Sequence, residues 1–118
     1  MLVVEDDEAM AAVVQAWLRV DPRFTSVDQV GSVAAARSWI ARASPDIVVL
    51  DYGLPDGAAA DVMAAVRELD PAPAVVLHTS RSDFRELGQA LGCQDAVHKG
   101  DWRGLADRLL TLASGVAR

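Results

Sequence analysis

The feature that most constrains the fold is the run of four large apolar residues at positions 47–50, which ends at Asp51. Uninterrupted apolar runs of this length, rich in branched side chains, are typical of a β-strand that is buried on both faces. Gly53, Pro55 and Gly57 follow and predict a turn. Asp51 is therefore expected at the carboxyl end of a central strand, where open α/β sheets bind their ligands. The alternative is that Asp51 only caps the segment that follows.

Short apolar runs and helical patterns alternate along the whole chain. Strands are expected at residues 1–4, 24–30, 47–50, 74–78 and 95–98. Between and after them, apolar residues recur at the three- and four-residue spacing of a helix face. The five expected faces are Met10, Val13, Val14, Trp17 and Leu18; Val33, Ala36 and Ile40, with Ser32 as N-cap; Val62, Met63, Val66 and Leu69; Phe84, Leu87 and Leu91; and Leu105, Leu109, Leu112 and Val116. This alternation predicts an α/β fold, a parallel sheet with helices on both faces and right-handed crossovers.

Size and composition narrow the class of protein. A chain of 118 residues predicts one domain, residues 1–118, and 52% hydrophobic with 24% charged residues fits a folded globule. The net charge of −6 argues against direct nucleic-acid binding by this segment. No apolar run approaches the roughly 20 residues that span a bilayer, and no export signal opens the chain. The single cysteine, Cys93, excludes an internal disulfide and suits a reducing cytoplasm.

Polar residues follow each of the stronger strands. They are Glu5, Asp6 and Asp7 after the first, Asp51 after the third, Thr79 and Ser80 after the fourth, and Lys99 after the last. Because the carboxyl ends of parallel strands open on one edge, these side chains are expected to lie together. Carboxylates gathered in this way repel one another unless a cation lies among them, and Mg²⁺ prefers such oxygen ligands. The backbone carbonyl of Gly53 could turn toward the same ion.

Lys99 is the only lysine among the 11 basic residues. In a chain otherwise supplied with arginine, this choice indicates a place where a compact point charge on a flexible stem is needed. One ammonium, one hydroxyl and one metal ion around an aspartate form a set suited to holding a phosphoryl group.

With these residues the chain resembles the receiver (CheY-like) domains of bacterial two-component response regulators, over essentially its whole length. The matching segments are residues 2–7, residues 48–57, Thr79-Ser80 and Lys99. The resemblance implies a flavodoxin-like (βα)5 doubly wound parallel sheet with strand order 2-1-3-4-5. It also implies a cytoplasmic phosphorelay protein that is not itself an enzyme.

The resemblance assigns the metal and phosphoacceptor roles at the first and third strands. Asp51 matches the residue that accepts a phosphoryl group from a sensor histidine kinase or phosphotransfer protein. Glu5 and Asp6 match the acidic pair that holds Mg²⁺, with Asp6 as the direct ligand and Glu5 acting through water. Gly53 matches the position whose backbone carbonyl completes the metal site.

The resemblance assigns phosphate-binding roles to three further residues. Thr79 matches the hydroxyl that moves to the phosphoryl oxygen, and Ser80 the small residue beside it. Lys99 matches the cation that pairs with the phosphate. An attached output domain or a partner protein would read the modification, and a homodimer is left open.

The chain departs from the family pattern on the side that normally carries the output. Ala96 stands where the family has Tyr or Phe, Gly100 stands where it often has proline, and the helix between residues 82 and 92 looks half a turn short. Two hypotheses therefore remain at this stage: a phosphorylatable receiver, and a receiver-like interaction module that works without phosphorylation. The site residues favour the first hypothesis, and the departures favour the second.

Overall fold

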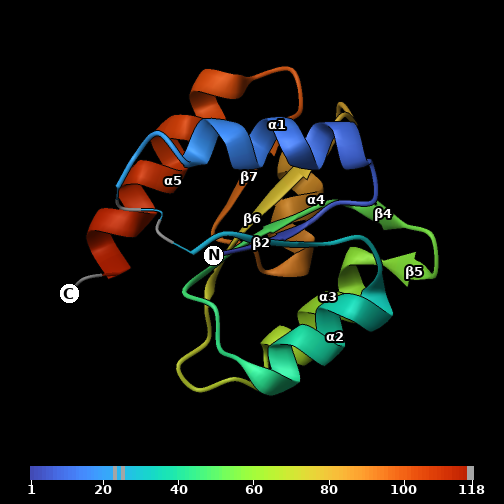
Figure 1. The fold of residues 1–118 in the computed structure, drawn as a ribbon. Helices are drawn as coiled ribbons and strands as arrows, with labels where there is room; N and C mark the ends of the chain where they lie inside the picture. The colour runs from blue at the N-terminus through green and yellow to red at the C-terminus, as the bar shows by residue number, and fades with distance from the viewer. Residues whose placement is uncertain (23, 25, 117–118) are drawn as a thin grey trace.

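In the computed structural model, which describes residues 1–22, 24 and 26–116, five parallel strands form one sheet in the order β2-β1-β3-β6-β7 (Figure 1). They are β1 (Leu2–Val4), β2 (Asp28–Val30), β3 (Ile47–Leu50), β6 (Ala74–Thr79) and β7 (Asp95–His98). The predicted order 2-1-3-4-5 is confirmed, because β6 and β7 are the fourth and fifth strands of this sheet. β3 lies in its middle, so Asp51 does follow a central strand.

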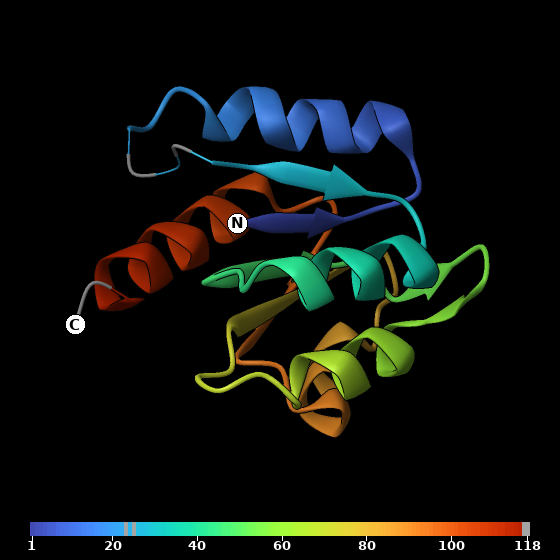
Figure 2. The same ribbon diagram turned by 60° about the horizontal axis from the view of Figure 1, so that its bottom comes forward.

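The helices cover both faces of the sheet (Figures 1 and 2). One layer contains α1 (Glu8–Leu18) and α5 (Trp102–Val116); the other contains α2 (Val33–Arg42), α3 (Ala59–Val66) and α4 (Phe84–Leu91). Side chains alternate between the layers along each strand. Leu2 and Val4 of β1 pack in the cluster of α2 and α3, whereas Val3 packs in the cluster of α1 and α5. The sheet thus has a separate apolar core on each face.

Local sequence explains where the first two helices begin. The Asp7 carboxylate accepts hydrogen bonds from the backbone N–H groups of Ala9 and Met10, which otherwise lack partners at the start of α1. Ser32 caps α2 as predicted, with its Oγ 3.0 Å from the backbone nitrogen of Ala35. The predicted face of α2, Val33, Ala36 and Ile40, is buried in full.

The structure corrects two details of the predicted apolar faces. The buried stripe of α1 is Ala11, Val14 and Leu18, and Val13 is 52% exposed. Leu69 lies beyond α3, which ends at Val66. At the other end of the chain, Leu105 and Leu109 are buried as predicted and Leu112 is partly buried, but the side chain of Val116 is outside the described residues.

The second strand is shorter than predicted. Only Asp28–Val30 pairs with β1, whereas residues 24–30 were expected to be extended. Phe24 is buried against the layer of α1 and α5 rather than in the sheet, and residue 25 is outside the described residues. The apolar character of Phe24 therefore reflects packing beneath the helices.

A small hairpin, which the sequence does not predict, follows the central strand. Its strands are β4 (Gly53–Leu54) and β5 (Gly57–Ala58), paired antiparallel. At its tip, the Asp56 carboxylate accepts hydrogen bonds from the backbone nitrogens of Val33 and Ala34, at 2.7 and 3.0 Å. The hairpin is thereby attached to the start of α2.

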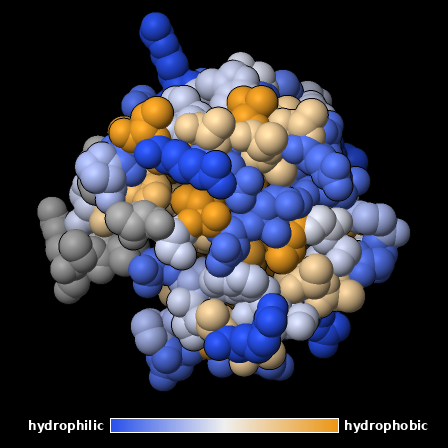
Figure 3. All heavy atoms as spheres, in the orientation of Figure 1, coloured by the Kyte–Doolittle hydropathy of each residue, from blue (hydrophilic) through white to orange (hydrophobic). Residues whose placement is uncertain are grey.

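The surface is mixed in character. Apolar residues appear in Figure 3 as separate patches among hydrophilic ones, and the exposed large hydrophobic residues of the described chain are Val13 and Val20. No described helix has both the length and the apolar content required to cross a membrane.

Candidate functional site

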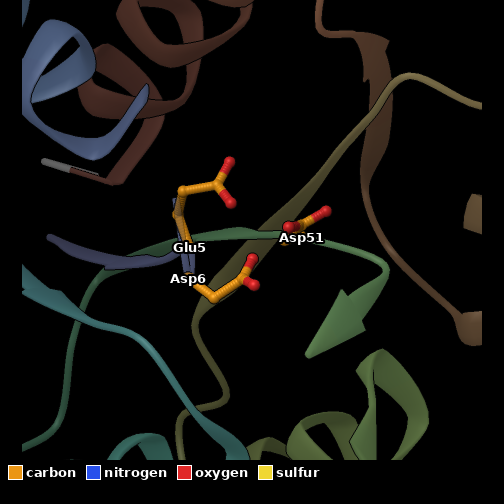
Figure 4. A group of neighbouring side chains, drawn as sticks. All are labelled: Glu5, Asp6 and Asp51. Atoms are coloured by element: carbon orange, nitrogen blue, oxygen red, sulfur yellow. The ribbon is translucent and has the colours of Figure 1, made fainter. Parts of the chain in front are cut away.

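Three carboxylates meet at the carboxyl edge of the sheet. Glu5 and Asp6 follow β1, and Asp51 follows β3, which pairs with β1 (Figure 4). One ligand oxygen from each lies within 4.8 Å of the others, which is close enough for one cation to contact all three. The donor set consists of oxygen atoms alone, and one member, Asp6, is exposed to solvent. Hard divalent ions that retain water suit such a set.

Glu5 is the most deeply placed of the three acids, at 3% exposure. Its side chain accepts a hydrogen bond from the backbone nitrogen of Asp7 at 3.3 Å, and its backbone nitrogen donates to the Val30 carbonyl at 2.9 Å. The side chain of Gln29 donates to the Glu5 carbonyl at 2.7 Å. The bond from Asp7 gives the buried carboxylate a partner, and the two backbone bonds fix Glu5 to β2.

Asp51 is held by β1 and by the loop that follows β3. Its backbone nitrogen donates to the Val4 carbonyl at 2.9 Å, and Oδ1 accepts from the backbone nitrogen of Tyr52 at 2.8 Å. Its exposure is only 9%, so the carboxylate is accessible at the edge but shielded on most sides. A reagent must approach it through the mouth between the strand ends.

Lys99 completes the charge cluster from the end of β7. Its Nζ lies 2.7 Å from Oε1 of Glu5 and 3.3 Å from Oδ2 of Asp51, and the side chain is 18% exposed. The backbone nitrogen of Lys99 donates to the Thr79 carbonyl at 2.9 Å, which fixes the lysine to β6. The ammonium therefore lies where charge added to Asp51 would accumulate.

The charges in this cluster alter one another. Burial, the hydrogen bond with Glu5 and the Glu5 charge raise the pKa of Asp51 to about 7, against the opposing effect of Lys99. Burial alone would raise the pKa of Glu5, but its hydrogen bonds with Asp51 and Lys99 outweigh burial and lower it. Burial opposes the charge of Lys99, yet the two acids raise its pKa. Without a metal ion, one ammonium therefore does not fully compensate two buried carboxyl groups.

Thr79 and Ser80 lie where the sequence predicts, at the carboxyl end of β6, but in different surroundings. Thr79 is the last residue of the strand and is 3% exposed; its Oγ1 accepts a hydrogen bond from the backbone nitrogen of Arg81 at 3.3 Å. Ser80 is exposed. Gly53 is also exposed and begins β4, two residues after Asp51, so its role as a carbonyl ligand stays a prediction.

Two residues at the mouth of the site were missed from the sequence. The guanidinium of Arg81 lies 5.1 Å from the centre of the Tyr52 ring and also pairs with Asp83, at 3.0 Å. This contact joins the loop after β3 to the loop after β6. Their positions in the sequence could have indicated that they lie near the site, because Tyr52 directly follows Asp51 and Arg81 directly follows Ser80.

The comparison with protein families agrees with this geometry. The sequence matches the family "Response regulator receiver domain" over residues 1–105. The chain belongs to this family. Its fold, the central position of Asp51 and the acidic cluster are those that the resemblance implied.

Curated relatives are larger proteins that share the receiver-like segment. The chain is 33% identical over 113 residues to a protein-glutamate methylesterase/protein-glutamine glutaminase of Rhizobium etli, covering 91% of this chain and 33% of the relative. It is 30% identical over 93 residues to the transcriptional regulatory protein DpiA of Escherichia coli, covering 79% of this chain and 41% of the relative. The chain thus spans between a third and two fifths of the length of these relatives.

Solved structures give the same fold. The receiver domain of the TMAO respiratory system response regulator TorR is 29% identical, with a TM-score of 0.82 over 98% of this chain and 96% of that one. The response regulator TrrA of Thermotoga maritima, solved in complex with Mg²⁺ and BeF, has a TM-score of 0.81 at 20% identity, covering 94% of this chain and 96% of that one. The latter likeness concerns the fold alone.

Proposed function

We propose that this chain is a Mg²⁺-dependent phosphoacceptor, with Asp51 receiving a phosphoryl group from a phosphohistidine on a sensor histidine kinase or phosphotransfer protein. The observation that carries the proposal is the placement of Asp51, mostly buried, beside two further carboxylates and within 3.3 Å of Lys99. Family membership supports the same assignment.

The chemical step is a transfer between two nucleophiles. A carboxylate oxygen of Asp51 attacks phosphorus, the bond from phosphorus to the donor's imidazole nitrogen breaks with its electron pair going to that nitrogen, and an acyl phosphate forms. The imidazole takes up one proton from water at its other ring nitrogen and so leaves as the neutral molecule. Asp51 must be ionised to attack, and its raised pKa opposes ionisation in the metal-free protein. Mg²⁺ held by Glu5, Asp6, Asp51 and the Gly53 carbonyl would supply the positive charge that favours the ionised form.

The remaining site residues would hold the phosphoryl oxygens. Lys99 would exchange part of its contact with Glu5 and Asp51 for a contact with the new charge. The Thr79 hydroxyl would leave the backbone nitrogen of Arg81 and turn toward phosphate, with Ser80 beside it. Electrostatic groups in place before the transfer accelerate it, because they need little reorganisation.

The partners and the wider protein follow from the same proposal. We assign residues 1–118 to one receiver domain in the cytoplasm, which signals to an output domain or a partner protein and could also form a homodimer. The methylesterase relatives are enzymes of which this chain covers a third, so their activity is not assigned to these residues. The receiver-like module without phosphorylation gains no support, since the charged residues of the site lie together in the described part of the chain.

Intact mass spectrometry tests the proposal. After incubation with acetyl phosphate and Mg²⁺, the protein should gain the mass of one phosphoryl group. The gain should be absent in Asp51→Asn and when Mg²⁺ is replaced by a chelator. The exposed Asp46→Asn serves as a matched control and should be modified like the wild type. An unmodified wild-type protein, or equal modification of Asp51→Asn, would refute the assignment.

A further inference from the structure

At position 96, α4 and β7 are in direct contact, with no room between them for a larger side chain. A Cβ atom built on Gly88 of α4 would lie 2.8 Å from the Cβ of Ala96, closer than real Cβ atoms approach. The helix therefore rests directly on the strand at this point. Ala96 has no side-chain torsion that could change, and the space for a larger side chain between the two elements is occupied by the backbone of α4.

His98 lies one pleat further along the same face of β7 and makes the contacts that Ala96 cannot make. Its Nε2 is 3.0 Å from the Ser80 carbonyl, and its Nδ1 is 2.9 Å from the backbone nitrogen of Gly100. Because the Gly100 N–H donates to Nδ1, that nitrogen carries no proton. The ring proton is therefore on Nε2, which donates to the Ser80 carbonyl.

The same ring contacts the first residue of α4. The rings of His98 and Phe84 are edge to face, with centroids 5.9 Å apart and an interplanar angle of 66°. Phe84 is only partly buried, and the buried residue of α4 is Gly88. His98 thus touches both the turn after Thr79 and the start of the helix that follows this turn.

The backbone pairing between β6 and β7 ends at Thr79, one residue before Ser80. Thr79 pairs with His98 in the sheet, and the Lys99 nitrogen donates to the Thr79 carbonyl. The Ser80 carbonyl is one residue beyond this ladder and is held by the imidazole instead. A displacement of the Ser80 carbonyl therefore acts on the His98 side chain rather than on the backbone ladder.

We propose that His98 is a positioning residue that couples the Thr79–Ser80 turn to the start of α4, through its hydrogen bond to the Ser80 carbonyl and its ring contact with Phe84. The inference rests on the proposed function, because the Thr79 hydroxyl must move toward a phosphoryl group for a displacement to arise. When Thr79 Oγ1 leaves the Arg81 nitrogen, the turn shifts, the hydrogen bond carries the shift to the imidazole, and Phe84 follows. A ligand biases such an element only through contacts that differ between its two arrangements, and this hydrogen bond is one.

The test separates binding at the site from its effect on α4. Beryllofluoride with Mg²⁺ serves as the phosphoryl mimic, fluorine NMR measures its occupancy, and hydrogen exchange measures the response of residues 84–91. His98→Phe keeps a ring for Phe84 but loses the donor. His98→Gln keeps an N–H donor at the same number of bonds from Cβ. Asp95→Asn, on the opposite face of β7 and paired with Arg108, is the matched control.

We expect all three variants to bind beryllofluoride like the wild type. His98→Phe and His98→Gln should each lose at least half of the change in exchange over residues 84–91, because the first loses the donor and the second loses the ring, whereas Asp95→Asn should keep all of it. An unchanged response in His98→Phe, with full occupancy, would overturn the coupling role. Absence of a bound fluorine signal in the wild type would instead overturn the proposed function.

A second measurement on the wild type needs no variant, should His98→Phe fail to fold. Nitrogen NMR of the imidazole should show the proton on Nε2 in the free protein and a change in that signal when beryllofluoride binds. A ring nitrogen signal that is the same with and without the bound mimic would contradict the proposal.

Discussion

Two helices of equal length on the same face of the sheet are held very differently. α3 and α4 have eight residues each, but α3 buries Ala59, Val62, Met63 and Val66, whereas α4 buries only Gly88. At the start of α3, the Asp61 carboxylate accepts a hydrogen bond from the Ala58 nitrogen at 2.9 Å, whereas the N-cap residue of α4 makes no side-chain cap bond. Helices with few buried apolar contacts open and move at lower cost than core helices. α3 therefore belongs to the rigid frame of the site, and α4 is the element able to respond to it.

The largest expected effect is on stability, and it tests this comparison directly. Met63→Ala in α3 should lower the free energy of unfolding by about 2 to 5 kcal/mol, because it leaves a cavity in a filled core. Leu87→Ala in α4 removes a partly buried side chain and should cost less than half as much. Denaturant unfolding measures both. Equal losses would show that α4 is as firmly packed as α3.

The buried faces of α2 and α3 could largely be predicted, because their apolar residues repeat at helical spacing. The N-cap of α2 could also be predicted, because Ser32 directly precedes the helix that it caps. Val33, Ala36 and Ile40 are buried as a set, and Ser32 caps its own helix. The carboxyl-edge site is predictable for a similar reason. Parallel strands place residues that directly follow them at one edge, so Asp51 and Lys99 meet although they are far apart in sequence.

The remaining features depend on contacts between distant segments, which leave no periodic pattern. The β4–β5 hairpin has two residue pairs and is attached by Asp56 to another element. The bond from His98 to the Ser80 carbonyl depends on how β7 and the turn after β6 are placed. Phe24 was assigned to a strand because an aromatic residue in a short apolar segment suits either a sheet or a helix interface.

The face of the sheet that α1 and α5 cover contains a buried polar side chain, His78, through which acid should destabilise the fold. His78 of β6 is 2% exposed and contacts Trp102 edge to face, and its Nε2 has no hydrogen-bond partner among the described residues. Burial, then the Lys99 charge, lowers its pKa from 6.5 to about 4. Below pH 6.5, His78 therefore takes up a proton in the unfolded chain but stays neutral in the folded protein until the pH approaches 4. Stability should be fully present above that pH and fall as the pH decreases toward 4.

The pH prediction is measured as a difference between two proteins, because other groups titrate in the same range. From pH 7 to pH 4, the wild type should lose about 3 kcal/mol more stability than His78→Leu, which has no ring to protonate. Denaturant unfolding at several pH values gives both curves. Parallel curves would show that folding does not change the pKa of His78.

Mg²⁺ should stabilise the folded protein by binding at the carboxylate cluster. Glu5, Asp6 and Asp51 repel one another without the ion, and a ligand that binds only the folded state adds about 2.7 kcal/mol at 100 times its Kd. Thermal unfolding should therefore show a Tm higher by several degrees in millimolar Mg²⁺, and Asp6→Asn should reduce the gain while leaving the fold intact. A Tm that millimolar Mg²⁺ leaves unchanged would place the metal site elsewhere or nowhere.

Lys99 should matter for transfer far more than for the fold or for the metal. Lys99→Ala should bind Mg²⁺ nearly as the wild type does but give a lower phosphorylation yield or a weaker response. Lys99→Arg should also be impaired, because a planar guanidinium does not replace a point charge held between Glu5 and Asp51. Intact mass gives the yield, and hydrogen exchange gives the response. Full activity of Lys99→Ala in both would make this residue an ordinary surface lysine.

The central claim is that charge added at Asp51 reaches α4 and leaves α3 in place. Hydrogen exchange of the wild-type protein, with and without Mg²⁺ and beryllofluoride, tests it in one experiment on both helices. Because Ala96 has no rotamer to change, we predict a modest change centred on residues 79–92, little change around residue 96 and none in residues 59–66. Strong changes confined to residues 95–98, with residues 79–92 silent, would contradict the account.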